Sequence, residues 1–197
     1  MTWVLVGLGN PDEEYAHTRH NAGRMAVQKF AEKKSFSDWK DEKKPQAFVA
    51  RGRIGKSLAL AVLPNTYMNK SGISAAYYVK NVKAAEKLIV AYDELDLPLG
   101  TIKLSFNRGS GGHKGIESIA KALKTRAFMR IRIGISPLGA KGVAKKPQGE
   151  EKVEKFILGD FSKDDTKELA KLFKRVSDAI EMTVTEGRER AMNVFNQ

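Results

Sequence analysis

The sequence contains no cysteine among its 197 residues. This absence excludes disulfide bonds, thiolate zinc sites and a cysteine nucleophile together. Histidine is also scarce, with three in the whole chain, so a general base that works near neutral pH has few candidates. No apolar stretch approaches the ~20 residues that a membrane helix requires. The chain starts directly with a strand-like run, Trp3-Val4-Leu5-Val6, without a basic leader, and we therefore expect a cytoplasmic protein.

Acidic residues are few relative to basic ones, with 23 Asp and Glu against 35 Lys and Arg. The formal net charge is +12, and an excess of this size suits an anionic partner such as nucleic acid, a phosphorylated substrate or an acidic membrane face. The alternative is a surface whose charge only keeps the protein in solution. The size of the excess favours an anionic partner, and composition alone does not identify it.

Short β-like runs alternate with helix-like patterns along the chain. Apolar residues alternate or cluster in runs at residues 3–8, 47–54, 57–63, 88–92, 101–106 and 129–135. Apolar residues spaced by three and four predict helices over 22–34, 71–81, 115–124 and 164–186. This pattern predicts a single three-layer α/β domain over residues 1–197, in which a twisted sheet is covered by helices on both faces.

Two connections refine this prediction. The runs 47–54 and 57–63 are joined at Gly55-Lys56, which is typical of an antiparallel hairpin and predicts a mixed sheet. The segment from Pro137 to about Gly149 is rich in glycine and proline and is typical of a mobile surface loop rather than a linker between domains.

Five polar clusters fall at predicted strand ends or in loops, where functional sites are usually built. They comprise residues 9–11, 15–21, 64–72, 93–96 and 109–115. The second cluster contains His17 and His20, and the fifth contains His113, so all candidate general bases of the chain lie in these segments.

Asp93 directly follows the apolar run 88–92. A carboxylate in this position can orient an imidazole, fix its tautomer and stabilise its charged form. The alternative is that Asp93 caps a turn, but histidine-bearing loops at neighbouring strand ends favour a His–Asp pair. With no cysteine and no serine in a G-x-S-x-G elbow, a bound water is the simplest nucleophile. Asn10 and Asn69 could donate amide hydrogens to a developing oxyanion, although asparagine is also common in turns.

A metal site is a competing interpretation of the same residues. His17-x-x-His20 and Asp93-x-x-Asp96 could together supply four ligands. The His-x-x-His spacing is a weak signal, and Arg19 would place a cation between the two histidines. The sequence therefore favours a metal-free site.

The basic residues are concentrated between Lys103 and Arg132, where Glu117 is the only acidic residue. The eight basic residues are Lys103, Arg108, Lys114, Lys121, Lys124, Arg126, Arg130 and Arg132. This segment includes the glycine-rich loop and the helix predicted after it. A helix N-terminus with flanking cations is a natural phosphate site. The alternative, a solvated basic helix face, explains the glycine run less well, because glycine is costly unless the backbone turns sharply or approaches a ligand.

These clusters, in this order, resemble the bacterial-type peptidyl-tRNA hydrolase family from Val4 to about Phe195. The resemblance is carried by Val6-Gly7-Leu8-Gly9-Asn10-Pro11, Tyr15 with Thr18-Arg19-His20-Asn21-Ala22-Gly23, Thr66-Tyr67-Met68-Asn69-Lys70-Ser71-Gly72, Asp93-Glu94-Leu95-Asp96-Leu97-Pro98, Gly109-Ser110-Gly111-Gly112-His113 and Arg130-Ile131-Arg132-Ile133-Gly134-Ile135. The resemblance implies one α/β domain with a mixed sheet, acting as a monomer without cofactor or metal.

The resemblance also implies the reaction, in which the ester between a peptide and the 3′ ribose of tRNA is hydrolysed and the tRNA is recycled. It implies that His20 activates water, that Asp93 keeps His20 basic and oriented, and that Asn10 helps to discriminate N-blocked from free aminoacyl-tRNA. The implied partner is peptidyl-tRNA, bound through its 3′ end and its acceptor-stem phosphates.

The remaining site residues are implied to bind this substrate. By resemblance, Tyr15, Tyr67 and Asn69 contact the 3′ end and the peptide, and His113 shapes the cleft. The basic side near Arg132, with Lys103 and Arg108, matches the region that holds tRNA phosphates. Bases at a tRNA 3′ end are unstacked and could stack on the two tyrosines, for which core packing is the alternative.

The sequence departs from the family pattern at two positions. Lys114 follows Gly-Gly-His, where relatives usually carry asparagine, and an ammonium group can only donate where an amide both donates and accepts. Lys114 could instead pair with a terminal phosphate. Ser105 stands where relatives often carry a basic residue, and Lys103 and Arg108 could compensate. Two rivals remain, a non-catalytic RNA-binding protein on the same fold and a metal-dependent phosphoesterase.

Overall fold

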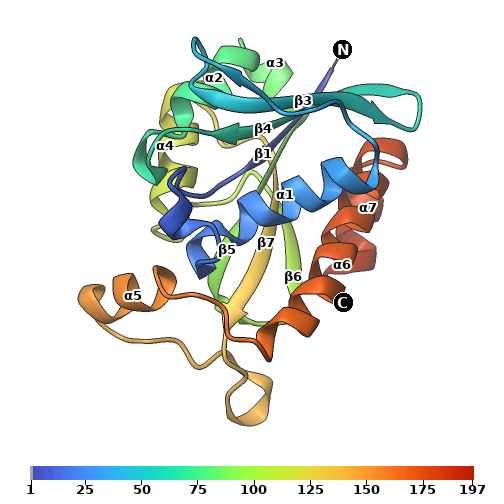
Figure 1. Ribbon diagram of the computed structural model, residues 1–197. Coiled ribbons are helices and arrows are strands. Elements are labelled where there is room, and N and C mark those ends of the chain that lie inside the picture. The colour runs from blue at the N-terminus through green and yellow to red at the C-terminus, as the bar shows by residue number, and fades with distance from the viewer. Residues whose placement is uncertain (1) are drawn as a thin grey trace.

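The computed structural model describes residues 2–197, apart from the side chain of Lys141, and these residues form one seven-stranded sheet (Figure 1). The strands are β1 Trp3–Gly7, β2 Lys40–Glu42, β3 Ala47–Ile54, β4 Ser57–Pro64, β5 Leu88–Pro98, β6 Ile102–Phe106 and β7 Met129–Ser136. Their order in the sheet is β2-β3-β4-β1-β5-β7-β6. The four central strands β4, β1, β5 and β7 run parallel, and the outer strands β2, β3 and β6 pair antiparallel with their neighbours, so the sheet is mixed as predicted.

Helices cover both faces of this sheet (Figure 1). They are α1 Ala22–Lys33, α2 Gly72–Tyr78, α3 Val82–Ala85, α4 Lys114–Leu123, α5 Glu150–Ile157, α6 Asp165–Thr185 and α7 Arg188–Phe195. Side chains of a strand alternate between its two faces, and in β1 Leu5 joins one buried cluster while Val4 and Val6 join the other. The first cluster packs against α1, α6 and α7, and the second against α2, α3 and α4.

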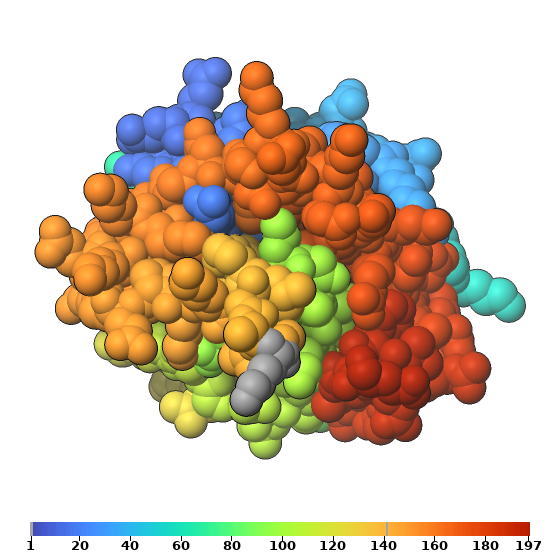
Figure 2. Space-filling view, turned by 90° about the horizontal axis from the view of Figure 1, so that it is seen from below, coloured from blue at the N-terminus to red at the C-terminus, as the bar shows by residue number. Residues whose placement is uncertain are grey.

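The helix α5 differs from the other helices in having no buried residue. In Figure 1 it lies at the lower left, away from the sheet faces that the other helices cover. Seen from below in Figure 2, its orange atoms lie beside the blue N-terminal segment, with α6 and α7 on the other side of the molecule. Phe156 and Ile157 of α5 pack against the first buried cluster, and Nη1 of Arg19 donates to the carbonyl oxygens of Phe156 and Gly159.

Most predicted elements agree with the structure, and four were missed. The predicted helix over 164–186 is α6, and the hairpin joined at Gly55-Lys56 is β3–β4. The predicted helix over 71–81 ends early, at Tyr78, because Val79 is extended, and α3 follows separately. The missed elements are β2, α3, α5 and α7. They are short, and their apolar periodicity is correspondingly weak.

A close approach of α1 to β5 sets the distance between the segments that carry His20 and Asp93. A Cβ atom added at Gly23 would lie 2.1 Å from the carbonyl oxygen of Ala91, so only glycine permits this contact without displacement of the backbone. Gly23 follows His20 by three residues, and Ala91 precedes Asp93 by two. The glycine therefore brings the start of α1 against the segment of β5 that carries the carboxylate. Among the described residues, no helix is long and apolar enough to span a bilayer.

Candidate active site

His20 and Asp93 are adjacent in the folded chain although 73 residues separate them in sequence. The Nδ1 atom of His20 lies 3.1 Å from Oδ1 and 3.0 Å from Oδ2 of Asp93. His20 lies in a 3-10 turn, Arg19–Asn21, that leads directly into α1, and Asp93 lies within β5. Both side chains are buried, with relative exposures of 8% and 4%, so the pair is largely shielded from water but not sealed.

A second imidazole holds the same carboxylate. His113 is the N-cap of α4, and its Nδ1 accepts hydrogen bonds from the N–H groups of Gly115 and Ile116. An accepting Nδ1 requires the neutral ring to carry its proton on Nε2. That Nε2–H donates to Oδ1 of Asp93 at 2.9 Å. Asp93 is thus held between two imidazoles whose ring centroids are 5.4 Å apart.

These contacts fix the protonation pattern of His20. Because a carboxylate can only accept, Nδ1 of His20 must donate to Asp93, and Nε2 is then left with a lone pair in the neutral ring. Burial acts to lower the pKa of His20, but the charge of Asp93 and the hydrogen bond to it prevail and raise that pKa above its ordinary value. Burial opposes ionisation of Asp93, yet the two imidazoles together lower its pKa. The imidazole of His20 is therefore a stronger base than usual, and its basic atom, Nε2, lies on the side of the ring away from Asp93.

Asn10 is fixed by three hydrogen bonds. Its Oδ1 accepts from the backbone N–H of Met68 at 3.0 Å, which sets the orientation of the amide. The side chain of Asn21 accepts from the backbone N–H of Asn10 and donates to its carbonyl oxygen. Nδ2 of Asn10 has no hydrogen-bond partner among the groups that the structure describes. This amide is a spare donor at the wall of the cleft that also contains His20.

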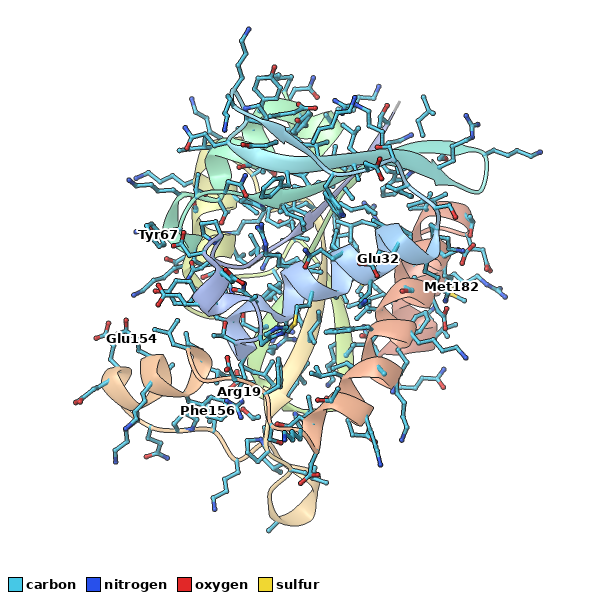
Figure 3. The ribbon with its side chains drawn as sticks, viewed as in Figure 1. Arg19, Glu32, Tyr67, Glu154, Phe156 and Met182 are labelled. Carbon is cyan, nitrogen blue, oxygen red and sulfur yellow. The ribbon has the colours of Figure 1, made fainter. Side chains whose placement is uncertain are left out.

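The cleft around these groups has a volume of about 530 Å³. Its lining includes Asn10, Tyr15, His20, Asp93, His113 and Lys114. The opposite wall is formed by α5, which sequence reasoning did not predict. Tyr67 and Asn69 are exposed and do not line this cleft, and Tyr67, which is 57% exposed, projects at the left margin of Figure 3. The pKa of Tyr15 is raised chiefly by the nearby charge of Glu14, and Tyr67 adds to this shift, so Tyr67 lies within electrostatic reach of the cleft.

Comparison with known proteins identifies the family to which this chain belongs. The family model for peptidyl-tRNA hydrolase matches residues 4–197. The chain belongs to the peptidyl-tRNA hydrolase family. The family and the class of enzyme expected from the sequence motifs are thereby confirmed.

Individual members of the peptidyl-tRNA hydrolase family are similar over almost their whole length. The peptidyl-tRNA hydrolase of Syntrophotalea carbinolica is 38% identical over 98% of this chain and 96% of its own. That of Thermotoga petrophila is 40% identical, again over 98% of this chain and 96% of its own. A crystal structure of peptidyl-tRNA hydrolase from Acinetobacter baumannii superimposes with a TM-score of 0.87 at 33% identity, covering 99% of this chain and 94% of that one. The predicted fold class is confirmed by this match.

The basic segment of this peptidyl-tRNA hydrolase family member divides into exposed and buried positions. Lys103, Arg108 and Lys114 are exposed. Arg132 is directly opposite Lys103 in the β6–β7 pair, and its Nε donates to Glu94 at 2.9 Å. Arg130 is fully buried and donates to the carbonyl oxygens of Arg108 and Gly109, so it shapes the glycine-rich loop from below. Arg130 contributes to the basic composition of the segment, but a buried guanidinium that binds backbone carbonyls is not exposed to RNA.

The four-ligand metal site considered from the sequence is not assembled. His17 is exposed and lines a separate groove between α1 and α6, and Asp96 at the cleft pairs with Lys146. The potential ligand atoms of His20, Asp93 and His113 do lie within 4.8 Å of one another. Hydrogen bonding accounts for their geometry, since both imidazoles donate to the carboxylate.

His113 and Asn21 are the site groups whose roles sequence reasoning missed. Both were part of recognised motifs, but neither was predicted to hold Asp93 or Asn10. A signal for His113 was present, because a polar residue after Gly-Gly and before an amphipathic run is an N-cap position. Nothing in the sequence indicated that the same ring would also reach β5.

Proposed function

We propose that this protein hydrolyses the ester that links a peptide, or an N-blocked amino acid, to the 3′ ribose of tRNA. It would act as a monomer in the cytoplasm, without metal or cofactor, and recycle tRNA from peptidyl-tRNA released during translation. The observation that carries the proposal is the free Nε2 of His20, in a ring that Asp93 orients at the wall of a cleft shared with Asn10.

In the proposed reaction Nε2 of His20 takes a proton from water while the water oxygen forms a bond to the ester carbonyl carbon. The negative charge that develops on the carbonyl oxygen is stabilised by a donor, for which Nδ2 of Asn10 is placed. The bond from carbonyl carbon to the 3′ oxygen then breaks, and the imidazolium returns its proton to that oxygen. The products are a peptide with a free carboxylate and a tRNA with a free 3′ hydroxyl.

Substrate binding is assigned to groups around and beyond the cleft. Tyr15 lines the cleft and Tyr67 is close enough to influence Tyr15, which supports our assignment of both rings to stacking on unpaired bases of the 3′ end. Asn69 lies in the 3-10 turn Met68–Lys70, which Tyr67 caps, and it is exposed, so we assign it to the same end of the substrate as Tyr67. Asn10 would also recognise the blocked amino group, since its amide is rigidly held.

Phosphate contacts are assigned to three exposed cations and to Arg132, which is partly buried and pairs with Glu94. Lys114 is the first residue of α4 and is exposed, so its ammonium group adds to the positive end of the helix dipole. The next two backbone N–H groups of α4 are already bound by His113. Lys103 and Arg132 are side by side on the antiparallel pair β6–β7, and Arg108 is exposed in the loop after β6. These positions suit successive phosphates of an acceptor stem.

The decisive assay measures release of an N-acetylated amino acid from tRNA. The wild-type protein is expected to cleave it equally with and without chelator. His20→Ala should reduce kcat/KM by about 10² to 10⁴, the usual contribution of a general base. His17→Ala is the matched control, because His17 is exposed in another groove and its loss should leave the rate unchanged.

Other outcomes would assign another function. Binding of tRNA without any cleavage would support a non-catalytic RNA-binding protein, for which Lys114 in the position of the usual asparagine is the one favourable observation. Activity that disappears with chelator would support a metal-dependent esterase. Equal activity of His20→Ala and wild type would refute the role of His20 as the general base.

A further inference from the structure

The helix α5 presents one face to the cleft. The residues of this segment that line the cleft are Glu150, Val153, Glu154, Ile157 and Leu158. Their spacing of three and four is that of a single helical face. Glu151, Lys152 and Lys155 lie on the remaining surface of α5 and do not line the cleft. The cleft wall is thus partly apolar and carries two carboxylates.

This face is held in a defined position. Arg19 Nη1 donates to the carbonyl oxygen of Gly159 at 3.0 Å, and its guanidinium lies 4.5 Å from the ring centroid of Phe156 (Figure 3). The backbone N–H of Arg19 also donates to Gly159, and Thr18 forms a β-bridge with Asp160. The C-terminal end of α5 is therefore anchored to the segment that carries His20.

The two glutamates differ from the other acids of the cleft. Asp93 is bound by two imidazoles, Glu94 pairs with Arg132, and Asp96 pairs with Lys146. Glu150 and Glu154 form no ion pair with any side chain that the structure describes. Two uncompensated negative charges thus face the space where substrate enters.

A wall of this charge cannot favour the RNA part of the substrate, because phosphates are repelled by carboxylates. The exposed cations Lys103, Arg108 and Lys114 lie on β6, in the loop after β6 and at the start of α4, and thus outside α5. The acyl part of the substrate must then extend along α5, where Val153 and Ile157 offer apolar contacts. Opposite charges of substrate and site attract, so basic side chains of the peptide suit Glu150 and Glu154.

We propose that α5 is the specificity wall for the peptide, and that Glu150 and Glu154 favour peptides with basic side chains over peptides with acidic ones. This inference rests on the proposed esterase function and adds the class of peptide that the enzyme prefers. Charge pairs in partly exposed positions change equilibria modestly, so the expected preference is about three- to tenfold for the two glutamates together.

The test compares N-acetylated tripeptidyl-tRNAs that share the tRNA and the C-terminal residue and carry Lys, Gln or Glu at the two preceding positions. For the wild type, kcat/KM should fall in the order Lys, Gln, Glu. Glu150→Lys and Glu154→Lys should each reduce the ratio of Lys to Glu substrates, and the double variant should reverse it. High salt should weaken the preference, because exposed charges are screened.

Glu151→Lys is the matched control, with the same charge change on the same helix but outside the cleft lining. Any general gain in tRNA affinity from the added charge affects every substrate equally and cancels in the ratio. Equal kcat/KM for Lys and Glu peptides with the wild type, or an equal shift by Glu151→Lys, would overturn the inference. N-acetylglycyl-tRNA, whose acyl group is short, tests the esterase separately: failure to cleave it would refute the proposed function, whereas its cleavage without charge preference would refute only the inference.

Discussion

Lys114 is the cleft residue for which the sequence motif led us to expect asparagine. It lines the cleft together with His20, and its charge acts to lower the pKa of that imidazole. The sum of all effects still raises the pKa of His20, because Asp93 prevails. Lys114 thus tunes the base from across the cleft in addition to any contact with phosphate.

Replacement of Lys114 by the asparagine of relatives should change the pH profile. The neutral imidazole is the active base, so activity increases as pH rises through the pKa of His20. Removal of the nearby cation removes an effect that lowers this pKa, and the acidic limb of kcat/KM should therefore move to higher pH. Lys121→Asn is the control, since Lys121 lies further along α4 and does not line the cleft. An unmoved acidic limb in Lys114→Asn would contradict this electrostatic role.

The residues of the central pair were predictable because chemistry restricts their types. Few histidines exist, and Asp93 directly follows an apolar strand run, so a His–Asp pair could be predicted from the residues. That His20 is the histidine of this pair followed from the resemblance of its motif to the family. Their partners could not, because hydrogen bonds such as that of His113 to Asp93 depend on where α4 begins relative to β5. Arg130 and Arg132 look alike in sequence, yet the first is buried beneath a loop and the second faces Glu94.

Among the elements, α5 is connected to the base through Arg19. The guanidinium contacts two carbonyl oxygens, the ring of Phe156 and, at 3.9 Å, Asp165. Arg19→Lys retains the positive charge but loses the planar fork and its stacking. We expect KM to rise roughly fivefold with kcat nearly unchanged, since the loss of about 1 kcal/mol of hydrogen-bond energy has that effect.

Hydrogen exchange provides the structural measurement for Arg19→Lys, and amides of α5 should exchange faster than in the wild type. Arg188→Lys is a close control. Arg188 lies on α7, away from α5, and its guanidinium also stacks on an aromatic ring, 3.9 Å from the ring centroid of Phe106. A decrease of kcat alone, with unchanged KM and unchanged exchange in α5, would show that Arg19 acts on His20 and not on the helix.

Elements with a large buried face were predicted well, and those without one were missed. The helix α6 buries seven residues along one face, and its period is evident in the sequence. The helix α5 buries none, and β2 has three residues at the edge of the sheet. Such elements are fixed by tertiary contacts, and local sequence carries little information about them.

The whole molecule carries a net charge of +12, of which only part can act on tRNA. The logarithm of the tRNA-binding constant should fall linearly with the logarithm of the salt concentration, because phosphate contacts release counterions. Lys103→Gln and Arg108→Gln should each reduce the magnitude of the slope by about one. Lys83→Gln removes the same charge from α3, among the helices of the second buried cluster, and should leave the slope unchanged. If all three variants changed the slope equally, the slope would depend on net charge alone. That outcome would refute the assignment of phosphate contacts to Lys103 and Arg108.

The position of β1 in the sheet has a consequence for how the protein is made. Strand β1 lies between β4 and β5, whose residues are synthesised much later than those of β1. Parallel partners of this kind require long crossover connections, and contacts distant in sequence form slowly. His20 must likewise wait for Asp93, 73 residues further on. An enzyme proposed to act on abandoned translation products is thus inert until its own ribosome has passed Asp93.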